Sequence, residues 1–219
     1  MTIRRQHTPF DRLSPEDLAA WREIPAAVAS DCQNRGMAMA GAIQALKPGW
    51  RLCGQARTVI PTPGDNACIH WLCSIADPGE VVVVAAGGLE DVAMLGEMVA
   101  RQSLHRGLAG IVVDGAVRDT AMLLALGLPI FCRGKAVRGP HKEFGGFIDT
   151  PAAAGGVAVH PGDLILGDED GVAVVPLGQI RAVLAAARTH LAREEQWVAA
   201  LDRGERLVEI FGVAAPEPP

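Results

Sequence analysis

The stretch Glu80-Val81-Val82-Val83-Val84-Ala85 decides the fold class. An uninterrupted run of valines is typical of a strand that is buried on both faces, as in the centre of a parallel sheet. Two more apolar segments of strand length follow, at residues 111–114 and 129–132, with helical patterns between them. Strands that alternate with helices over short connections predict right-handed β-α-β units, so we expect an α/β protein.

The remaining elements follow from the same patterns. Ser14-Pro15-Glu16-Asp17 predicts a helix start with Ser14 as its cap. Leu89, Val92, Leu95 and Val99 recur at helical spacing after Gly87-Gly88, which is expected to end the valine strand. The expected helices are a short one after Ser14 and residues 25–46 (broken at Gly36), 66–75, 89–104, 120–126 and 177–201; the further strands are 56–60, 156–160, 163–166 and 171–175.

No linker separates these parts. We therefore expect one domain over residues 1–219, with N-terminal helices in 14–46, an α/β core in 54–176 and a C-terminal helix in 177–201.

Composition excludes several functional classes. The formal net charge is −5, there are only three lysines and there is no basic run, which argues against a nucleic-acid partner. Five cysteines without a C-x-x-C pair favour neither a disulfide framework nor a zinc site. The N-terminus lacks the apolar core of a signal peptide, and the longest apolar run is far shorter than a membrane span. We expect a cytoplasmic protein that does not associate with a membrane.

Familiar catalytic motifs are missing. No G-x-G-x-x-G follows a strand, the segment around Lys135 lacks the glycine and the Ser/Thr of a phosphate loop, and neither H-E-x-x-H nor G-x-S-x-G occurs. Nucleotide binding and serine hydrolysis therefore have no support in the sequence.

Three charged residues are the main candidates for a site. Glu97 lies where a loop is expected to lead into a helix, and Arg118-Asp119 follow the strand at 111–114, with twenty residues between Glu97 and Arg118. Such segments meet at the carboxyl edge of a parallel sheet, where ligands bind in these folds. Two carboxylates and a guanidinium there can hold a divalent cation and an anionic substrate. An ordinary surface salt-bridge cluster is the alternative.

The chain resembles the RraA-like family, which includes class II 4-hydroxy-4-methyl-2-oxoglutarate/4-carboxy-4-hydroxy-2-oxoadipate aldolases and the regulator of ribonuclease E activity. An Asp or Glu, twenty intervening residues and Arg-Asp mark the aldolases, and Glu97, Arg118 and Asp119 fit, with Glu in place of the commoner Asp. The other matching segments are Gly54-x-Ala56-x-Thr58-Val59, Pro63-Gly64-Asp65-Asn66, Pro78-Gly79-Glu80, Asp114-Gly115-Ala116-Val117, Gly155-Gly156-Val157-x-Val159-x-Pro161-Gly162-Asp163 and Gly167-Asp168-Glu169-Asp170-Gly171-Val172-x-Val174-Val175-Pro176.

This resemblance implies a three-layer ββα, swivelling-domain-like fold with a partly parallel sheet, assembled as a homotrimer or homohexamer with sites between subunits. It implies that Asp119 ligates Mg²⁺ or Mn²⁺, that Glu97 holds water on the metal, and that Arg118 binds pyruvate and its enolate. The backbone amides of Met98 and Val99 would receive the substrate carboxylate at a helix N-terminus.

A glutamate from the neighbouring subunit completes the family's site. Its position corresponds to Glu194, with Glu195 as the alternative, and either could instead be a solvated helix residue. Asn66 is either part of a helix cap or a substrate contact.

Three other polar groups have simpler interpretations. His141-Lys142 could meet a distal substrate carboxylate, or be an ordinary exposed loop. Asp168-Glu169-Asp170-Gly171 is too short for a calcium loop and predicts a turn between strands. We expect His160 to be structural.

The residue types agree with an aldolase that uses a metal. A retro-aldol reaction needs an electron sink, and none of the three lysines lies in an apolar strand where it could act as a buried amine. Carboxylates without clustered His or Cys suit Mg²⁺ or Mn²⁺. The expected reaction cleaves a 4-hydroxy-2-oxo acid to pyruvate and a second oxo acid, with oxaloacetate decarboxylation as a side activity. The alternatives are a non-catalytic regulator that binds a ribonuclease E-type partner, and a binding protein for small keto acids.

Overall fold

The computed structural model describes residues 2–6 and 9–217, and its core is a mixed sheet with the strand order β1-β7-β3-β4-β5-β6-β2. The strands are β1 (Thr2–Arg5), β2 (Gln44–Ala45), β3 (Leu52–Pro61), β4 (Val81–Leu95), β5 (Gly110–Val117), β6 (Ile130–Lys135), β7 (Gly145–Ile148), β8 (Ala152–Ala154), β9 (Val157–Val159), β10 (Leu164–Asp168) and β11 (Gly171–Val175). The helices are α1 (Pro15–Arg22), α2 (Ala26–Asp31), α3 (Ala67–Ile75), α4 (Glu97–His105), α5 (Thr120–Leu126), a 3-10 turn at Leu177–Gln179, α6 (Ile180–Asp202) and α7 (Leu207–Ile210).

The centre of the sheet is parallel, as the β-α-β pattern predicts. Strands β3, β4, β5 and β6 pair in parallel, and α3, α4 and α5 make the crossovers between them. The α/β prediction is therefore confirmed.

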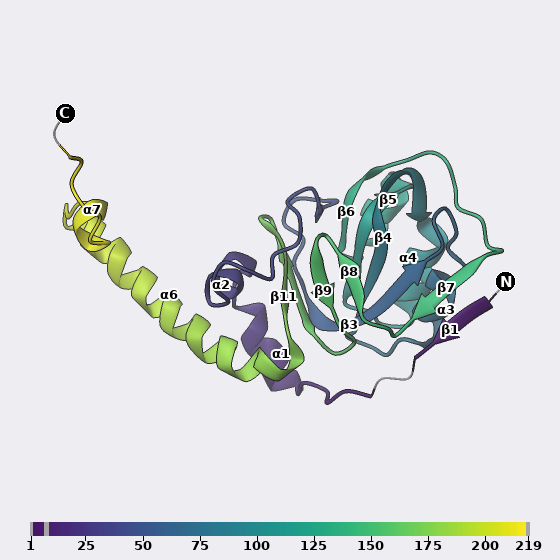
Figure 1. Ribbon diagram of the computed structural model, residues 1–219, viewed down its shortest axis with the longest axis horizontal. Helices are drawn as coiled ribbons and strands as arrows, with labels where there is room; N and C mark the ends of the chain where they lie inside the picture. Colours follow the sequence, from purple (N-terminus) through teal and green to yellow (C-terminus); the bar gives the residue numbers. More distant parts are fainter. Residues whose placement is uncertain (1, 7–8, 218–219) are drawn as a thin grey trace.

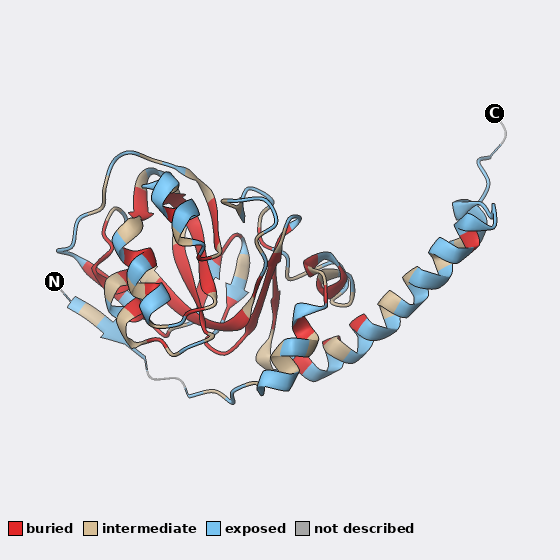
Figure 2. Ribbon diagram, turned by 180° about the vertical axis from the view of Figure 1, so that it is seen from behind, coloured by how far each residue is buried: buried red, intermediate tan, exposed pale blue. Residues whose placement is uncertain are grey.

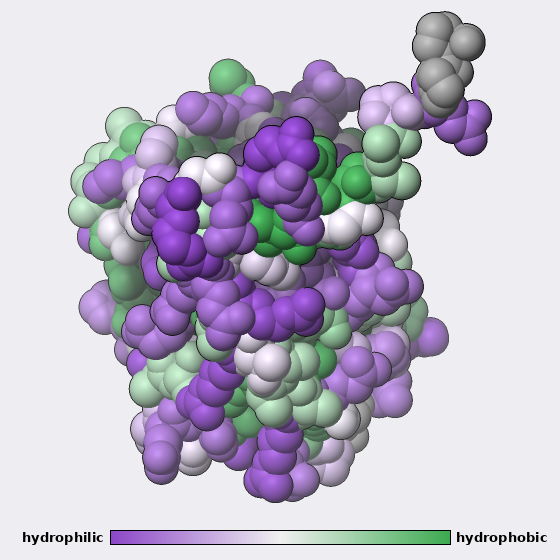
Figure 3. Space-filling view, turned by 90° about the vertical axis from the view of Figure 1, so that its left-hand side faces the viewer, coloured by the Kyte–Doolittle hydropathy of each residue, from purple (hydrophilic) through white to green (hydrophobic). Residues whose placement is uncertain are grey.

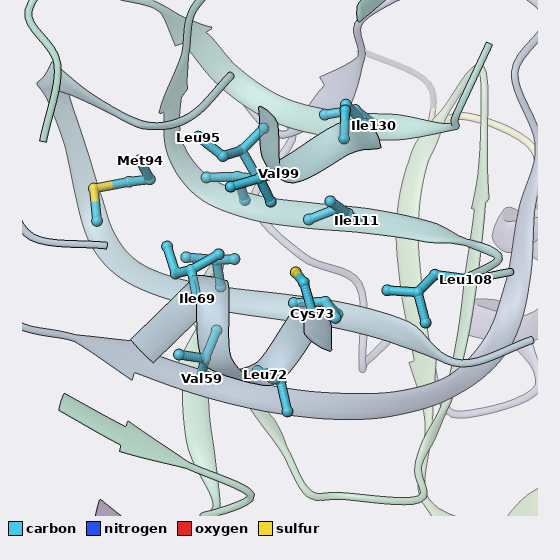
Figure 4. Close-up of a cluster of buried hydrophobic side chains, with 14 of the residues drawn as sticks. Val59, Ile69, Leu72, Cys73, Met94, Leu95, Val99, Leu108, Ile111 and Ile130 are labelled. Atoms are coloured by element: carbon cyan, nitrogen blue, oxygen red, sulfur yellow. The ribbon is translucent and has the colours of Figure 1, made fainter. Parts of the chain in front are cut away.

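The valine strand is buried on both faces and separates two hydrophobic cores. Val82 and Val84 face the helices α3 to α5, where Ile69 and Val99 pack against the sheet (Figure 4). Val81 and Val83 face the opposite way, toward a second β layer made by β8 to β11. Alternation of side chains along a strand assigns successive valines to different cores.

A third core joins the second β layer to an outer layer of helices. Trp21 of α1, Val28 of α2 and Val183 of α6 pack against Leu164 and Val175 of the β10–β11 hairpin. The predicted three-layer ββα arrangement is confirmed, and α1, α2 and α6 add a further helical layer on its outer β face (Figure 1). Along much of its length α6 projects from the body and is mostly exposed (Figure 2).

The helix predicted over residues 89–104 is wrong in its first half. Strand β4 continues to Leu95, and α4 begins only at Glu97. The register with β5 shifts between Val84 and Leu89, and again before Ala93 and Leu95. Such bulges interrupt the strict alternation of a strand, so the apolar residues adopt a spacing that imitates a helix. Gly87 and Gly88, with φ values of 65° and 78°, lie inside this irregular strand instead of ending it.

The helix predicted over residues 25–46 is also too long. Only α2 is helical, and Asn34, Arg35 and Met37 follow it with positive φ. The next residues cross the second β layer, where Met39 and Ile43 enter its core. Tertiary packing of this segment overrides the helix propensity of its alanines.

Several predicted boundaries are confirmed. Ser14 caps α1 in a capping box with Asp17, and residues 120–126 form α5. The segment 168–171 is the turn of the β10–β11 hairpin. The sequence patterns missed β1 and β7, which pair with each other at the edge of the sheet. Within the described residues, no helix is both long and apolar enough to cross a membrane.

A buried ion network joins β3 to the loops around it. The Arg57 guanidinium donates to both carboxylate oxygens of Asp149, at 2.7 and 2.8 Å, and to Glu80 at 2.8 Å. All three residues are at most 5% exposed. Burial alone would lower the pKa of Arg57, but Asp149 and Glu80 outweigh it and raise the pKa, so the guanidinium stays charged.

We expect Arg57→Met to lower the free energy of unfolding by about 3–5 kcal/mol, because two carboxylates then lose their buried partner. Urea unfolding followed by circular dichroism measures the loss. Arg188→Met, at an exposed position of α6, is the matched control and should change stability by less than about 0.5 kcal/mol. Equal effects of the two substitutions would contradict the assigned role of the network.

Candidate active site

The acidic and basic residues singled out in the sequence meet where β4 and β5 end. Strand β4 leads through Gly96 into α4, and β5 leads through Arg118 and Asp119 into α5. The backbone N–H of Glu97 donates to Asp119 Oδ2 at 3.1 Å. The carboxyl edge of the sheet therefore brings the two segments into contact, as its topology requires.

The backbone of Asp119 is unusual. It precedes α5 with φ 57° and ψ 35°, a left-handed conformation that Asp and Asn tolerate better than most residues. Its side chain does not cap α5 and reaches instead to the first turn of α4. This geometry directs the carboxylate into the space between the two helices.

Glycine is required at position 96. A Cβ atom there would lie 2.3 Å from Asp119 Oδ2 and 3.0 Å from Arg118 Cγ. The carboxylate thus occupies the space that a side chain at position 96 would fill.

Arg118 is held between the Asp119 carboxylate and a loop. Its Nε lies 3.6 Å from Asp119 Oδ2. A Cβ atom on Gly139 would lie 2.3 Å from Arg118 Nη1, so the loop after β6 passes directly over the guanidinium. Two backbone hydrogen bonds fix the beginning of this loop: the N–H of Ala136 donates to the carbonyl of Val117, and the N–H of Ala93 donates to the carbonyl of Arg138.

These residues surround a cavity of about 110 Å³. Six predicted residues lie in its lining: Asn66, Met98, Val99, Arg118, Asp119 and Lys142. The amides of Met98 and Val99 belong to the first turn of α4, where N–H groups have no acceptor within the helix. Together with the helix dipole and Arg118, they make this cavity suited to a small anion.

Asn66 contributes a buried acceptor at the same place. Its Nδ2 donates to the carbonyl of Met94 at 3.0 Å, which fixes the orientation of the amide. Its Oδ1 is buried and has no hydrogen-bond partner among the described residues. A buried acceptor without a partner can accept a hydrogen bond from a hydroxyl group of a ligand or from a water molecule.

The fully buried Asp65 holds the loop that follows. Its carboxylate accepts from the N–H groups of Ala67, Glu143, Phe144 and Gly145, at 2.6 to 3.3 Å. Burial alone would raise the pKa of Asp65, but these four bonds outweigh it and lower the pKa. The bond to Ala67 closes an Asx turn at the start of α3.

Two cationic or titratable groups line the cavity beside that loop. Lys142 lies directly before the anchored segment, and His70 follows Asn66 by four residues on α3. Burial, and then the charge of Lys142, lower the pKa of His70, so its imidazole is neutral at pH 7. Lys142 was among the residues predicted from the sequence, whereas His70 was missed, although its i,i+4 spacing from Asn66 places both on one helix face.

Other predicted residues do not point into the cavity of their own chain. The Glu97 carboxylate pairs with Arg101, one turn along α4, at 2.7 Å. Glu194 lies on the projecting part of α6 and pairs with His190 at 3.2 Å, and Glu195 is exposed. His141 is exposed and packs edge-on against Phe144. His160 lies 3.5 Å from Asp163, in the loop before β10.

The donor set at Asp119 suits a hard divalent cation. No group of three His, Cys, Asp or Glu side chains within the described ranges could hold a metal alone. Asp119 Oδ2 receives the Glu97 N–H, and no described group binds Oδ1. Mg²⁺ is often held by one or two carboxylates, with water and substrate as its other ligands, and the Asp119 carboxylate fits that mode.

The fold and the cavity define a class of protein: a small α/β protein that presents a carboxylate, a guanidinium and a helix N-terminus to one small cavity. A family model described as RraA-like, Aldolase/RraA, matches residues 26–174. The chain belongs to the RraA-like family.

Individual relatives extend this result. A Halalkalibacterium halodurans protein, provisionally named a 4-hydroxy-4-methyl-2-oxoglutarate aldolase, is 39% identical over 81% of this chain and 85% of its own. A Thermus thermophilus protein named 4-hydroxy-4-methyl-2-oxoglutarate aldolase is 33% identical over 67% of this chain and 89% of its own. The structure of Streptomyces coelicolor RraAS2 matches with a TM-score of 0.78 and 33% identity, over 85% of this chain and 98% of that chain. RraAS2 is described as an unusual member of the RNase ES inhibitor RraA family.

Proposed function

We propose that the protein is a divalent-metal-dependent class II pyruvate aldolase. Its substrates are 4-hydroxy-2-oxo acids such as 4-hydroxy-4-methyl-2-oxoglutarate or 4-carboxy-4-hydroxy-2-oxoadipate, and its products are pyruvate and a second oxo acid. The observation that carries this proposal is the convergence of Arg118, Asp119 and the first turn of α4 on one small cavity. The names of two relatives support the same activity.

The first turn of α4 binds the 2-oxo acid end of the substrate. The amides of Met98 and Val99 receive its carboxylate, and the Arg118 guanidinium faces its 2-oxo oxygen. Asp119 would hold Mg²⁺ or Mn²⁺, which when bound supplies an electrophile that stabilises negative charge on the oxo acid. Arg118 stabilises the same charge as the C3–C4 bond breaks and the electrons move into the pyruvate enolate.

The distal half of the substrate meets the α3 side of the cavity. The unpaired Oδ1 of Asn66 accepts a hydrogen bond from a water molecule beside the C4 hydroxyl, and Lys142 pairs with a distal carboxylate. Glu97, which Arg101 holds in this structure, orients the water that accepts the hydroxyl proton. Decarboxylation of oxaloacetate passes through the same enolate without that proton transfer, so it is the expected side activity.

We expect Gly96→Ala to lower kcat for pyruvate release by about 10²-fold, because the new methyl group displaces the Asp119 carboxylate by an ångström or more. Gly41→Ala is the matched control, since nothing lies within 4 Å of a Cβ at that position. Steady-state kinetics of both variants make the comparison. Full activity in Gly96→Ala would show that the position of the carboxylate does not matter.

A neighbouring subunit completes the site in this proposal. Exposed apolar side chains gather near the C-terminal end of the molecule, as expected of a contact surface (Figure 3). They are Leu201, Leu207, Val208, Phe211 and Val213. In a homotrimer or homohexamer, α6 would carry Glu194 to the cavity of the next chain.

Mixing inactive Glu194→Ala and Arg118→Ala subunits is expected to restore activity, since some sites then combine an intact Arg118 with an intact Glu194. Glu195→Ala in place of Glu194→Ala tests the alternative residue, and subunit exchange is verified by mass spectrometry. Mixed oligomers without activity would show that Glu194 does not act across the interface.

The decisive experiment measures pyruvate release from a panel of 4-hydroxy-2-oxo acids, with Mg²⁺, with Mn²⁺ and with a chelator. Metal-dependent release above background supports the aldolase.

Similarity to Streptomyces RraAS2, from a family of RNase ES inhibitors, favours a second candidate function. This candidate is a regulator that binds a ribonuclease E-type protein. Binding of such a ribonuclease without turnover of any oxo acid would support the regulator instead.

A further inference from the structure

A second cavity lies at the opposite edge of the sheet from the candidate active site. It has a volume of about 450 Å³ and lies between the α1–α2 segment and the beginnings of strands β3 and β5. Leu52 at the start of β3 and Ala109 before β5 belong to its lining, whereas the active site lies beyond the ends of β4 and β5. The two cavities share no residue. We name the larger one the basal cavity.

Part of its wall is apolar. Trp21, Ile24, Leu52 and Leu166 line it, and each is at most 3% exposed. The volume lies within the range of pockets that bind small organic molecules. This part of the wall offers water few hydrogen bonds, so an apolar group is its better occupant.

Two arginines bring positive charge to the same cavity. Arg22 ends α1 and Arg51 precedes β3, and neither forms a salt bridge with a described residue. Burial raises the pKa of the Cys53 thiol to about 11, and both arginines act against this rise, so both guanidinium groups lie near that thiol.

The carboxylates nearby form no ion pair with these arginines among the described residues. Asp168 accepts hydrogen bonds from the N–H groups of Ala26 and Asp170, at 2.7 and 3.1 Å, and so caps α2. Glu23 lines the cavity but makes no ion pair with either arginine. Within the described residues, both guanidinium groups therefore keep donors that are free to bind an anion.

The buried indole of Trp21 adds a second unsatisfied group. Its Nε1 is a donor with no acceptor in the described part of the chain. Buried indole N–H groups ordinarily have a partner, so this donor is an exception, and it lies behind the surface of the cavity.

We propose that the basal cavity binds an organic carboxylate with an aromatic or aliphatic apolar body. The carboxylate pairs with Arg22 and Arg51, and the body packs on Trp21, Ile24 and Leu166. This site is separate from the active site and does not rest on the aldolase activity.

The test titrates the full-length protein with phenylacetate and with octanoate, by isothermal calorimetry and by tryptophan fluorescence. Phenylacetamide and octanamide are the neutral controls. We expect saturable binding of the carboxylates at millimolar concentrations or below, and at least a tenfold loss of affinity for the amides. The double variant R22Q/R51Q should show the same tenfold loss, whereas R181Q/R188Q, with both changes on exposed positions of α6, should bind as the wild type does.

Arg118→Ala separates the two cavities. If the carboxylates bind to the Arg118→Ala variant as they do to the wild type, they occupy the basal cavity. Loss of binding in Arg118→Ala instead of R22Q/R51Q would place them in the active site and overturn the proposal. Equal affinity for acids and amides, or no saturable binding, would overturn it as well.

Discussion

Arg118→Ala is expected to lower kcat by 10²-fold or more for aldol cleavage and for oxaloacetate decarboxylation alike. Both reactions leave a pair of electrons that must enter the pyruvate enolate, and Arg118 borders the cavity where that charge develops. Removal of one donor that stabilises an oxyanion typically costs a factor of this size. Coupled assays of pyruvate formation, corrected for the reaction of oxaloacetate with free metal, measure both losses.

Two comparison variants make this result specific. Arg118→Lys keeps the charge but loses the fork of guanidinium donors, so it should recover only part of the activity. Arg188→Ala changes an exposed arginine of α6 and should leave both reactions unchanged. An effect of Arg118→Ala on KM alone would mean that the guanidinium binds substrate and transition state equally. Full retention of decarboxylation would rule out a common enolate.

Asp119→Asn is expected to abolish most metal-dependent turnover while the fold remains intact. Asparagine matches the shape of aspartate and tolerates the left-handed backbone at this position, so little strain is added. The neutral amide is a much poorer ligand for a hard cation than the carboxylate. Titration with Mn²⁺, followed by electron paramagnetic resonance, should show a large loss of affinity.

The readouts for Asp119 separate a ligand from a structural residue. Thermal unfolding should show only a small change in Tm, because the amide still offers an oxygen to the Glu97 N–H. Asp119→Ala, by contrast, should lose both metal affinity and stability, since it also removes this bond. Unchanged Mn²⁺ affinity in Asp119→Asn would remove Asp119 from the metal site.

The central strands could be predicted because their signal is local. Val81 to Val84 need no knowledge of their neighbours to be recognised as a doubly buried strand, and Ser14 with Asp17 marks a helix start in four residues. The continuation of β4 to Leu95 could not be predicted in this way. Its bulges depend on the register with β5, which no short window of sequence contains.

The candidate site could also be predicted only where its residues follow from local topology. Glu97, Arg118 and Asp119 could be brought together from the topology of one β-α-β unit. The loop that covers Arg118 could not, because Gly139 reaches it only after β6 has been placed. Likewise, the role of Asp65 depends on three amides almost eighty residues away. Side-chain direction was not predictable either: the Glu97 carboxylate turns to Arg101.

The contact between Gly96 and the Asp119 carboxylate has a consequence for the history of the family. The Asp119 carboxylate fills the space that a side chain at position 96 would need. Positions 96 and 119 therefore cannot vary independently. A relative that acquires a side chain at the position of Gly96 must first give up, or relocate, its carboxylate at the position of Asp119. Joint inspection of these two alignment columns should therefore sort lineages that retain this chemistry from lineages that have been recruited to other tasks.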